Sequence, residues 1–153
     1  MSFNPEDFYK LAKELSEDNN YIHLDDARIR TCVSRIYYSI FLKFREDLRK
    51  YIGNYEYDEV ARSGLIHSCL RRIIKKLDIT CGTKFERIQK LRKDSDYEVK
   101  ATIKRTDVED SLAIANHIFN NISQLLTNLS AKRSEIENII KEYYQKLQKR
   151  RKN

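Results

Sequence analysis

The chain has 153 residues, of which 30 are Lys or Arg and 23 are Asp or Glu, giving a net charge of +7 and a pI near 9.3. This length predicts one domain with a core of ordinary size, and three glycines with one proline favour helices over β-strands. The N-terminal stretch lacks the pattern of a secretory signal, and no apolar run approaches membrane-spanning length. We therefore expect a cytoplasmic protein with no membrane contact.

The cysteines and the net charge indicate which metal ions, cofactors and partners the chain can bind. Cys32, Cys69 and Cys81 have no short paired spacing, which indicates neither a zinc site nor a disulfide framework, so we expect no metal and no other cofactor. The positive charge suits an anionic partner such as RNA, DNA or an acidic protein surface. A solvated basic surface explains the same charge without any partner.

Two predicted helices cover the N-terminal third of the chain. Asn4-Pro5 predicts a helix start, and this helix should end near Asp18. Its predicted buried stripe is Phe8, Leu11, Ala12 and Leu15. Asp25 or Asp26 then caps a longer helix that runs to about Tyr51. The residues that this second helix buries at helical spacing are Cys32, Val33, Ile36, Tyr37, Ile40, Phe41, Phe44 and Leu48.

Capping boxes guide the prediction for the middle of the chain. A third helix is expected over residues 58–77, with an inward face made of Val60, Ile66, Leu70, Ile73, Ile74 and Leu77. Thr83–Glu86 has the pattern of a capping box that opens a fourth helix, which continues to Tyr97. Residues 98–105 are expected to form a loop. Thr106–Glu109 is a second capping box, and the helix that it opens meets no glycine or proline as far as Asn153.

The C-terminal part of the chain carries a heptad stripe with one polar member, Arg133. The stripe consists of Val108, Leu112, Ala115, Phe119, Ile122, Leu126, Leu129, Arg133, Ile136, Ile140, Tyr143 and Leu147. It forms either one long helix or two helices with a break near Ser130. The apolar residues of its second half either project to meet another chain or fold back on the same bundle: Ile136, Ile140, Tyr143 and Leu147. The sequence thus predicts an all-α protein, with an antiparallel four- to five-helix bundle over residues 1–129 and an amphipathic, basic helical extension over residues 130–153.

Several stretches in chain order resemble small stand-alone prokaryotic HEPN proteins over roughly residues 5–128. They are Ala27-x-x-Arg30-x-x-Val33-Ser34-Arg35-x-Tyr37-Tyr38-x-x-Phe41, His67 on the third helix, Leu91-Arg92-x-x-Ser95-Asp96-Tyr97, and the helix start at Val108-Glu109-Asp110. The third of these is similar to the R-x-x-A-D-Y motif of that family. The resemblance implies a helical bundle that pairs two-fold as a homodimer, with a cleft between the subunits.

The resemblance also implies a chemistry. Many HEPN domains are metal-independent endoribonucleases with an R-x(4–6)-H motif, in which the arginine clamps the scissile phosphate and the histidine moves the 2′-hydroxyl proton. Five residues after Arg92 this chain has Tyr97, and a phenol is a poor general base at neutral pH.

Three readings of the motif stay open. With Tyr97 as proton donor or phosphate ligand and Asp94 or Asp96 as base, the candidate catalytic residues are Arg92, Tyr97 and Asp96. Alternatively, these three side chains form a hydrogen-bonded cluster that fixes the fourth helix. A third reading is that Arg92 contacts RNA or nucleotide without cutting it.

Five further side chains are candidate RNA or phosphate contacts: Arg28, Arg30, Arg35, Tyr38 and His67. The first four share the polar face of the second helix, which is either a solvated face or one side of a basic groove. His67 follows Arg62 by five residues and lies where many HEPN proteins carry a histidine. The run Lys149–Lys152 would add phosphate contacts that salt removes. In some HEPN toxins a nucleotidyltransferase partner modifies a tyrosine at the position that is Val99 here, so that role does not carry over.

Two functions follow from these patterns. The first is an RNA-directed HEPN-like protein of a toxin–antitoxin or anti-phage defence system, either a metal-independent endoribonuclease or a degenerate relative that still binds RNA or nucleotide. The alternative is a non-catalytic helical module that dimerises or binds a partner protein through its C-terminal helix.

Overall fold

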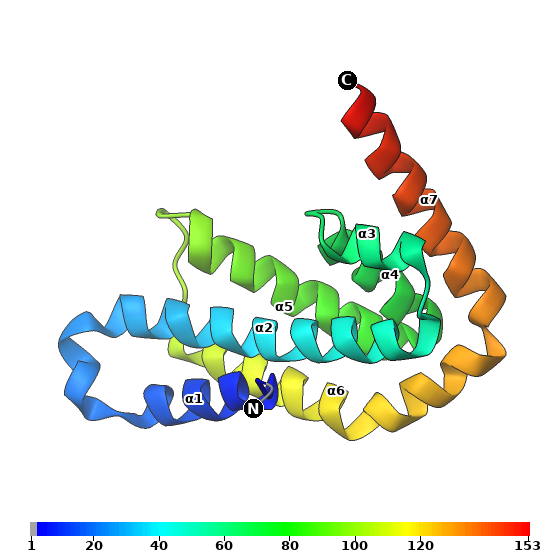
Figure 1. Ribbon diagram of the computed structural model, residues 1–153. Helices are drawn as coiled ribbons and strands as arrows, with labels where there is room; N and C mark the ends of the chain where they lie inside the picture. Colours follow the sequence, from blue (N-terminus) through cyan, green and yellow to red (C-terminus); the bar gives the residue numbers. More distant parts are fainter. Residues whose placement is uncertain (1–2) are drawn as a thin grey trace. The chain divides into compact units, whose positions relative to one another are not determined.

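A computed structural model describes residues 3–153, and it is all-α, as predicted (Figure 1). Over these residues it contains seven α-helices and one 3₁₀-helix, and no strand. Their bounds are α1 Glu6–Glu17, η1 Asn19–Leu24, α2 Asp25–Ile52, α3 Tyr55–Ala61, α4 Ile66–Leu77, α5 Ile79–Tyr97, α6 Arg105–Ala131 and α7 Arg133–Lys152. None of the helices in the described range combines the length and apolarity needed to cross a membrane.

The chain divides into two compact units. The first unit comprises the residues up to Lys43 together with Lys84–Asn120, and the second comprises Phe44–Thr83 with Asn121–Asn153. Each unit therefore joins two stretches that are distant in sequence, and each of α2, α5 and α6 contributes a segment to both units.

The first unit begins as the sequence predicts. The Asn4 side chain accepts a hydrogen bond from the backbone N–H of Glu6 at 3.1 Å, and Pro5, directly before the first helical residue, has a helical φ of −57°. The helix ends at Glu17, and the carboxylate of Asp18 then caps η1. One prediction for α1 is wrong, namely that Leu11 is buried. Leu11 is 50% exposed, and the fully buried residue of this turn is Ala12.

The core of the first unit consists of α2, α5 and α6 side chains. The stripe predicted for α2 is confirmed, since all of its members are buried. The stripe predicted for α6 is confirmed in part. Its members Val108, Ala115 and Leu129 are buried, whereas Leu112 and Phe119 are only half-buried. Ile114 and Ile118, which the heptad register leaves out, are buried in their place.

The second unit buries the apolar face of α7. Its core includes Phe44, Leu48, Tyr57, Val60, Leu70, Ile73, Ile74, Ile136 and Ile140. The helix α7 packs against α3 and α4, and all four members of its predicted stripe are buried there. This stripe therefore folds back within the same chain, which is one of the two alternatives that the sequence left open.

The predicted third helix is two helices. The side chain of Asn54 caps α3 by accepting from the N–H of Tyr57 at 2.8 Å, and α4 begins only at Ile66. Between them, the hydroxyl of Ser63 donates to the carbonyl of Val60 at 2.7 Å and accepts from the N–H of Leu65 at 3.2 Å. These local bonds, followed by Gly64, compete with helix formation and interrupt the predicted continuous helix.

Both predicted capping boxes are wrong by a few residues. Helix α5 begins at Ile79, because the Asp78 carboxylate accepts from the N–H of Cys81 at 2.6 Å, and the Thr83 hydroxyl lies inside the helix. Helix α6 begins at Arg105, and Asp107 accepts from the N–H of Lys104 at 2.7 Å. No helix start was predicted at Asp78 or Lys104, because the capping boxes at Thr83 and Thr106 match the sequence pattern of a helix start more closely.

The last helical stretch is two helices with a turn at Lys132, again one of the two alternatives. The N–H of Lys132 donates to the carbonyls of Asn128 and Leu129, at 3.1 and 3.2 Å. Its ammonium group donates to the carbonyl of Lys76 at 2.8 Å, and the Asn128 amide donates to Leu77. The turn between α6 and α7 thus caps the C-terminal end of α4.

Candidate functional site

The side chain that the sequence singled out most strongly, Arg92, is buried in the first unit. It lies on α5 and is 5% exposed. Its guanidinium carbon lies 5.0, 5.6 and 5.7 Å from the ring centroids of Tyr37, Tyr38 and Tyr97. Three aromatic faces or edges therefore surround one cation, a contact that stabilises a guanidinium where water is excluded.

Arg92 shares a hydrogen bond with the hydroxyl of Tyr37, and its contacts to Tyr97 and Asp96 are long. Its Nη1 lies 3.5 Å from the Tyr97 hydroxyl and 3.8 Å from Oδ2 of Asp96. That carboxylate oxygen also accepts from the hydroxyl of Ser34 at 3.2 Å. The Nε of Arg92 is buried and has no hydrogen-bond partner among the described residues. Buried donors are normally paired, so this guanidinium has capacity for a further acceptor.

Tyr37 forms the floor of this cluster. Its ring lies 5.6 Å from that of Phe85, and its hydroxyl accepts from the Gln89 amide at 3.3 Å. Burial raises the pKa of Tyr37 to about 12, so the phenol stays neutral at physiological pH. Tyr37 therefore positions Arg92 and does not act as a base. Sequence reasoning placed Tyr37 only in the core, although Gln89 lies one helical turn before Arg92.

Arg35 joins the cluster through Tyr38. The guanidinium carbon of Arg35 lies 5.4 Å from the Tyr38 centroid and 4.9 Å from that of Phe8. Because Arg92 contacts the same tyrosine, one ring of α2 is near two cations. The structure thus brings together Arg35, Tyr38, Arg92, Asp96 and Tyr97 of the predicted site residues.

Arg30 and Arg28 are bound to the chain itself. Arg30 donates to the carbonyls at the end of α5 and in the following loop, with distances of 3.2 Å to Asp94, 3.1 Å to Ser95, 3.1 Å to Glu98 and 2.5 Å to Ala101. Arg28 is buried, donates to the Asp18 carbonyl at 2.5 Å and pairs with Asp25. In this structure both side chains hold helix ends in place.

A shallow pocket of about 270 Å³ opens beside the cluster. Arg30, Asp96 and Tyr97 are among the residues that line it. Tyr97 is 69% exposed and Val99 is 92% exposed, so the end of α5 presents apolar surface to solvent. The Tyr97 ring therefore contacts Arg92 on one side and the pocket and solvent on the other.

No histidine is among the described side chains that contact Arg92. In the first unit, His23 lies exposed on η1 and His117 half-buried on α6. His67 is half-buried on α4 of the second unit, and its predicted role stays a prediction. The cluster can bind an anion through a guanidinium, a phenol and flanking rings, and it contains no group of the imidazole type for proton transfer.

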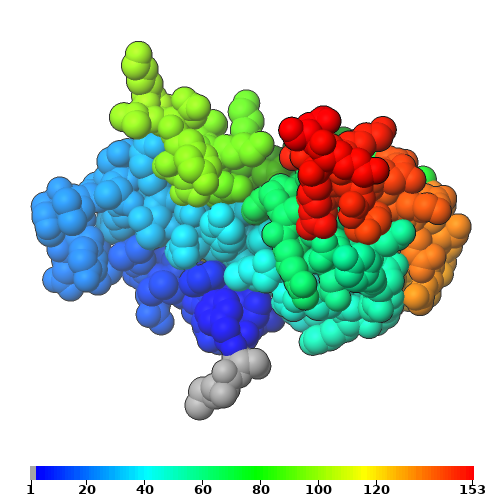
Figure 2. All heavy atoms as spheres, turned by 45° about the horizontal axis from the view of Figure 1, so that its top comes forward, coloured from blue at the N-terminus to red at the C-terminus, as the bar shows by residue number. Residues whose placement is uncertain are grey.

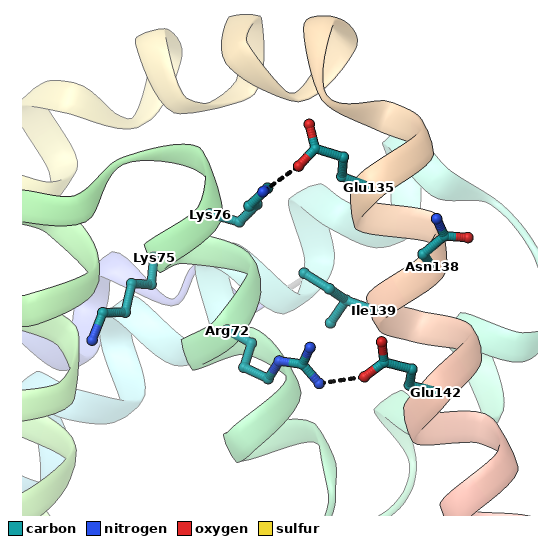
Figure 3. A pocket seen from close by; sticks show the side chains of 7 residues that line it. All are labelled: Arg72, Lys75, Lys76, Glu135, Asn138, Ile139 and Glu142. Atoms are coloured by element: carbon teal, nitrogen blue, oxygen red, sulfur yellow. Dashed lines mark hydrogen bonds and ion pairs between the residues drawn. The ribbon is translucent and has the colours of Figure 1, made fainter.

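A second hollow, which sequence reasoning missed, lies between α4 and α7 within the second unit (Figure 3). It measures about 440 Å³ and is crossed by two ion pairs, Arg72–Glu142 at 2.6 Å and Lys76–Glu135. The hydrogen bond from Arg72 lowers the pKa of Glu142. Figure 3 shows Lys75 extending away from both pairs. Because its carboxylates are matched by cations, the hollow is a seam that fastens α7 to α4.

The fold and the cluster define an all-α protein with a buried arginine ringed by tyrosines. The chain belongs to the same family as the uncharacterized protein MJ0992 of Methanocaldococcus jannaschii, to which it is 30% identical over 142 residues, or 84% of this chain and 77% of that protein. It is also 26% identical over 157 residues to the uncharacterized protein MJ0628 of the same organism, covering 92% of this chain and 91% of that one. No family model matches the chain, and no solved structure matches it.

Proposed function

We propose that this protein is a cytoplasmic, HEPN-like RNA-binding protein that uses Arg92 to hold a phosphate and does not cut the strand. The observation that carries the proposal is the incomplete bonding of a buried guanidinium. Its Nε has no partner, and its contacts to Tyr97 and Asp96 are long. A phosphate oxygen is the strong acceptor that such a fork accommodates best.

Access to Arg92 is controlled by Tyr97. The side chain of Arg92 is almost fully covered, and the ring of the exposed Tyr97 forms one part of that cover. Tyr97 is the last residue of α5, so its side chain can turn aside without disturbing the helix core. We expect the phosphate of a bound nucleotide to take the place of the Tyr97 ring over Arg92. The base of the nucleotide would then stack on the displaced ring from the side of the pocket.

The groups around Arg92 favour binding over cleavage. Strand cleavage through the 2′-hydroxyl needs a base and an acid near the phosphate. The cluster supplies Asp96, whose negative charge opposes an RNA phosphate, and the phenols of Tyr37 and Tyr97. Burial raises the pKa of Tyr37 to about 12, which removes it as a base at neutral pH. We therefore assign this chain to the non-cleaving relatives of the HEPN proteins that it resembles.

The test is binding of a fluorescent single-stranded RNA by wild type and Arg92→Gln, followed by anisotropy. Glutamine keeps a polar side chain of similar length, and loss of a charge-assisted contact should weaken binding about tenfold or more. Arg87→Gln is the matched control, since Arg87 lies on the same helix but is exposed and paired with Asp110. Equal affinity of wild type and Arg92→Gln, with unchanged melting temperature, would refute the proposal.

The same RNA, end-labelled and incubated in EDTA, tests the absence of cleavage. We expect it to stay intact with wild type and with Tyr97→Phe. Cutting by wild type that Arg92→Gln abolishes would show a metal-independent endoribonuclease and would replace the binding proposal. Light scattering of the same preparations tests the homodimer that the resemblance implies.

A further inference from the structure

The two units differ completely in their net charge. The first unit contains 14 Lys and Arg and 14 Asp and Glu, whereas the second contains 16 and 9. The whole net charge of +7 thus belongs to the second unit, and the unit that contains Arg92 is neutral. Electrostatic attraction of a polyanion should therefore act on a surface other than the Arg92 cluster.

The excess positive charge is concentrated at the end of α7. Its last turn contains Lys149, Arg150, Arg151 and Lys152, and all four are exposed. Arg151 is paired with Glu59 of α3 at 2.7 Å. This pair fixes the last turn of α7 against α3, and the remaining three cations have no described carboxylate partner.

Aromatic rings lie on the same pair of helices. Tyr55 at the start of α3 is 65% exposed, and its ring meets that of Tyr144 on α7 edge-to-face, with centroids 6.1 Å apart. Along α7, Tyr144 precedes Arg151 by two turns, and along α3, Tyr55 precedes Glu59 by one turn. Figure 2 shows the end of α7 (red) beside the segment that contains α3 (green). An exposed ring and three unpaired cations therefore share one surface, which we call the α3–α7 surface.

We propose that the α3–α7 surface binds single-stranded RNA, with Tyr55 stacking on a base and Lys149, Arg150 and Lys152 contacting phosphates. Grooves that bind single strands combine these two elements, an aromatic platform and a basic track. The choice of RNA as the polyanion rests on the proposed function. The location and the chemistry of the surface do not depend on Arg92.

The surface fits a nucleic acid better than a lipid bilayer. A helix that lies in a membrane interface needs a free apolar face beneath its cations. The apolar face of α7 is instead buried against α3 and α4, with Ile136, Ile140 and Tyr143 at or below 5% exposure. What remains outside is polar and aromatic, and an exposed ring favours unstacked bases over a duplex.

The experiment measures the salt dependence of binding of the full chain to a fluorescent single-stranded RNA of about 12 nucleotides. A triple variant, Lys149→Gln with Arg150→Gln and Lys152→Gln, leaves the Arg151–Glu59 pair intact. Its slope of log K against log salt should fall by about 2, because each lost phosphate contact on a single strand removes roughly 0.7. The matched control removes three exposed lysines of the first unit, Lys10, Lys13 and Lys104, and should leave the slope close to that of wild type.

Tyr55→Ala tests the stacking contact. It should weaken binding about fivefold or more without changing the salt slope, and Tyr55→Phe should restore the affinity. Tyr21→Ala, which removes an exposed tyrosine of the first unit, is the control. Equal slopes for the two triple variants would refute the proposal, as would wild-type affinity of Tyr55→Ala. Binding of the triple variant to anionic phospholipid vesicles is measured in parallel, and a loss there without a loss of RNA binding would assign the surface to membranes.

The result for the α3–α7 surface can be told apart from the result of the Arg92 test. If Arg92→Gln binds normally while the triple variant fails, the proposal for Arg92 is wrong and that for the α3–α7 surface stands. The reverse result refutes the α3–α7 surface alone. If wild type binds no single-stranded RNA at low salt, both are wrong.

Discussion

Three arginines of the first unit are buried or bound to its backbone. Arg28 and Arg92 are buried, and Arg30 donates to the carbonyls that follow α5. In the second unit the cations stay at the surface, where Arg72 and Arg151 pair with carboxylates and their neighbours face solvent. The two arrangements suit different tasks, since a buried guanidinium can select the position of one phosphate whereas an exposed run attracts any polyanion. The number of cations in a sequence therefore does not show which kind of anion contact they make, whereas their burial does.

The largest effect that we expect concerns a close contact between two helices of the second unit. A Cβ added at Gly82 would lie 2.4 Å from the Cα of Lys75, which is backbone and cannot move aside. Gly82→Ala should therefore lower the free energy of unfolding by about 3 kcal/mol. At Gly64 a Cβ meets nothing within 4 Å, so Gly64→Ala should be neutral or stabilising by less than about 1 kcal/mol. Urea unfolding measures the free energy of unfolding of both variants. Equal values would contradict the close contact between α4 and α5 at Gly82.

A somewhat smaller effect is expected for Arg30 in the first unit. Lysine cannot reproduce a fork that reaches the carbonyls of Ser95, Glu98 and Ala101 together. Arg30→Lys should cost about 2 kcal/mol. Hydrogen exchange should show the loss as faster exchange in residues 98–104. Arg35→Lys, whose side chain contacts rings and not carbonyls, is the comparison and should leave that loop protected.

Alkaline pH should weaken both units through their buried thiols. Burial raises the pKa of Cys32 in the first unit to about 11 and that of Cys69 in the second to about 12, from 9.0. Both thiols hold their protons in the folded chain more firmly than in the unfolded chain, so stability is intact below pH 9 and falls above it. By pH 10 the loss should be about 1 kcal/mol per thiol. Urea unfolding at pH 8 and pH 10 should show this loss in wild type. A Cys32→Ala, Cys69→Ala double variant should keep only the smaller loss that comes from Tyr37 and Tyr57, whose pKa values burial also raises.

The smallest effect is expected at the seam between α4 and α7. Arg72 and Glu142 are both largely exposed, and such pairs contribute little to stability. Glu142→Gln should leave the melting temperature at neutral pH unchanged within error. Because the pKa of Glu142 is lowered, this pair contributes to stability at any pH above the ordinary pKa of a glutamate. The contribution is lost as the pH falls from that value through the lowered pKa of the folded chain. A large drop in melting temperature at neutral pH would mean that the seam, and not the buried stripe, holds α7 in place.

Most of the fold was predictable from the sequence because helices are set by local patterns. The periodic apolar residues of α2 and the Asn4-Pro5 start were sufficient to define their helices. The starts of α5 and α6 were missed because Asp78 and Asp107 act through single hydrogen bonds that a stronger Thr motif nearby obscured. The break at Ser63 depends on a side chain that can bond either to water or to its own backbone, and sequence alone does not decide between them.

The candidate site was predictable in its members and not in their roles. Arg92, Asp96 and Tyr97 lie within two successive turns of α5, so their proximity followed from helix geometry. The hydrogen bonds of Arg30 could not be predicted in this way, because its acceptors are carbonyls more than sixty residues away that only the fold brings near. The same holds for Tyr37, whose ring could be identified as core but not as the floor of a cation site.

The interleaved composition of the units sets the order in which the chain can fold. The carbonyls of Lys76 and Leu77 at the end of α4 accept hydrogen bonds from the side chains of Lys132 and Asn128. Because α7 packs against both α3 and α4, we expect these two helices to keep apolar surface uncovered during synthesis until α7 has emerged. Contacts between stretches so far apart in sequence slow folding and prolong the exposure of apolar surface. A nascent chain of this protein is thus most prone to aggregate while it lacks its last twenty or so residues, the stretch that completes the second unit.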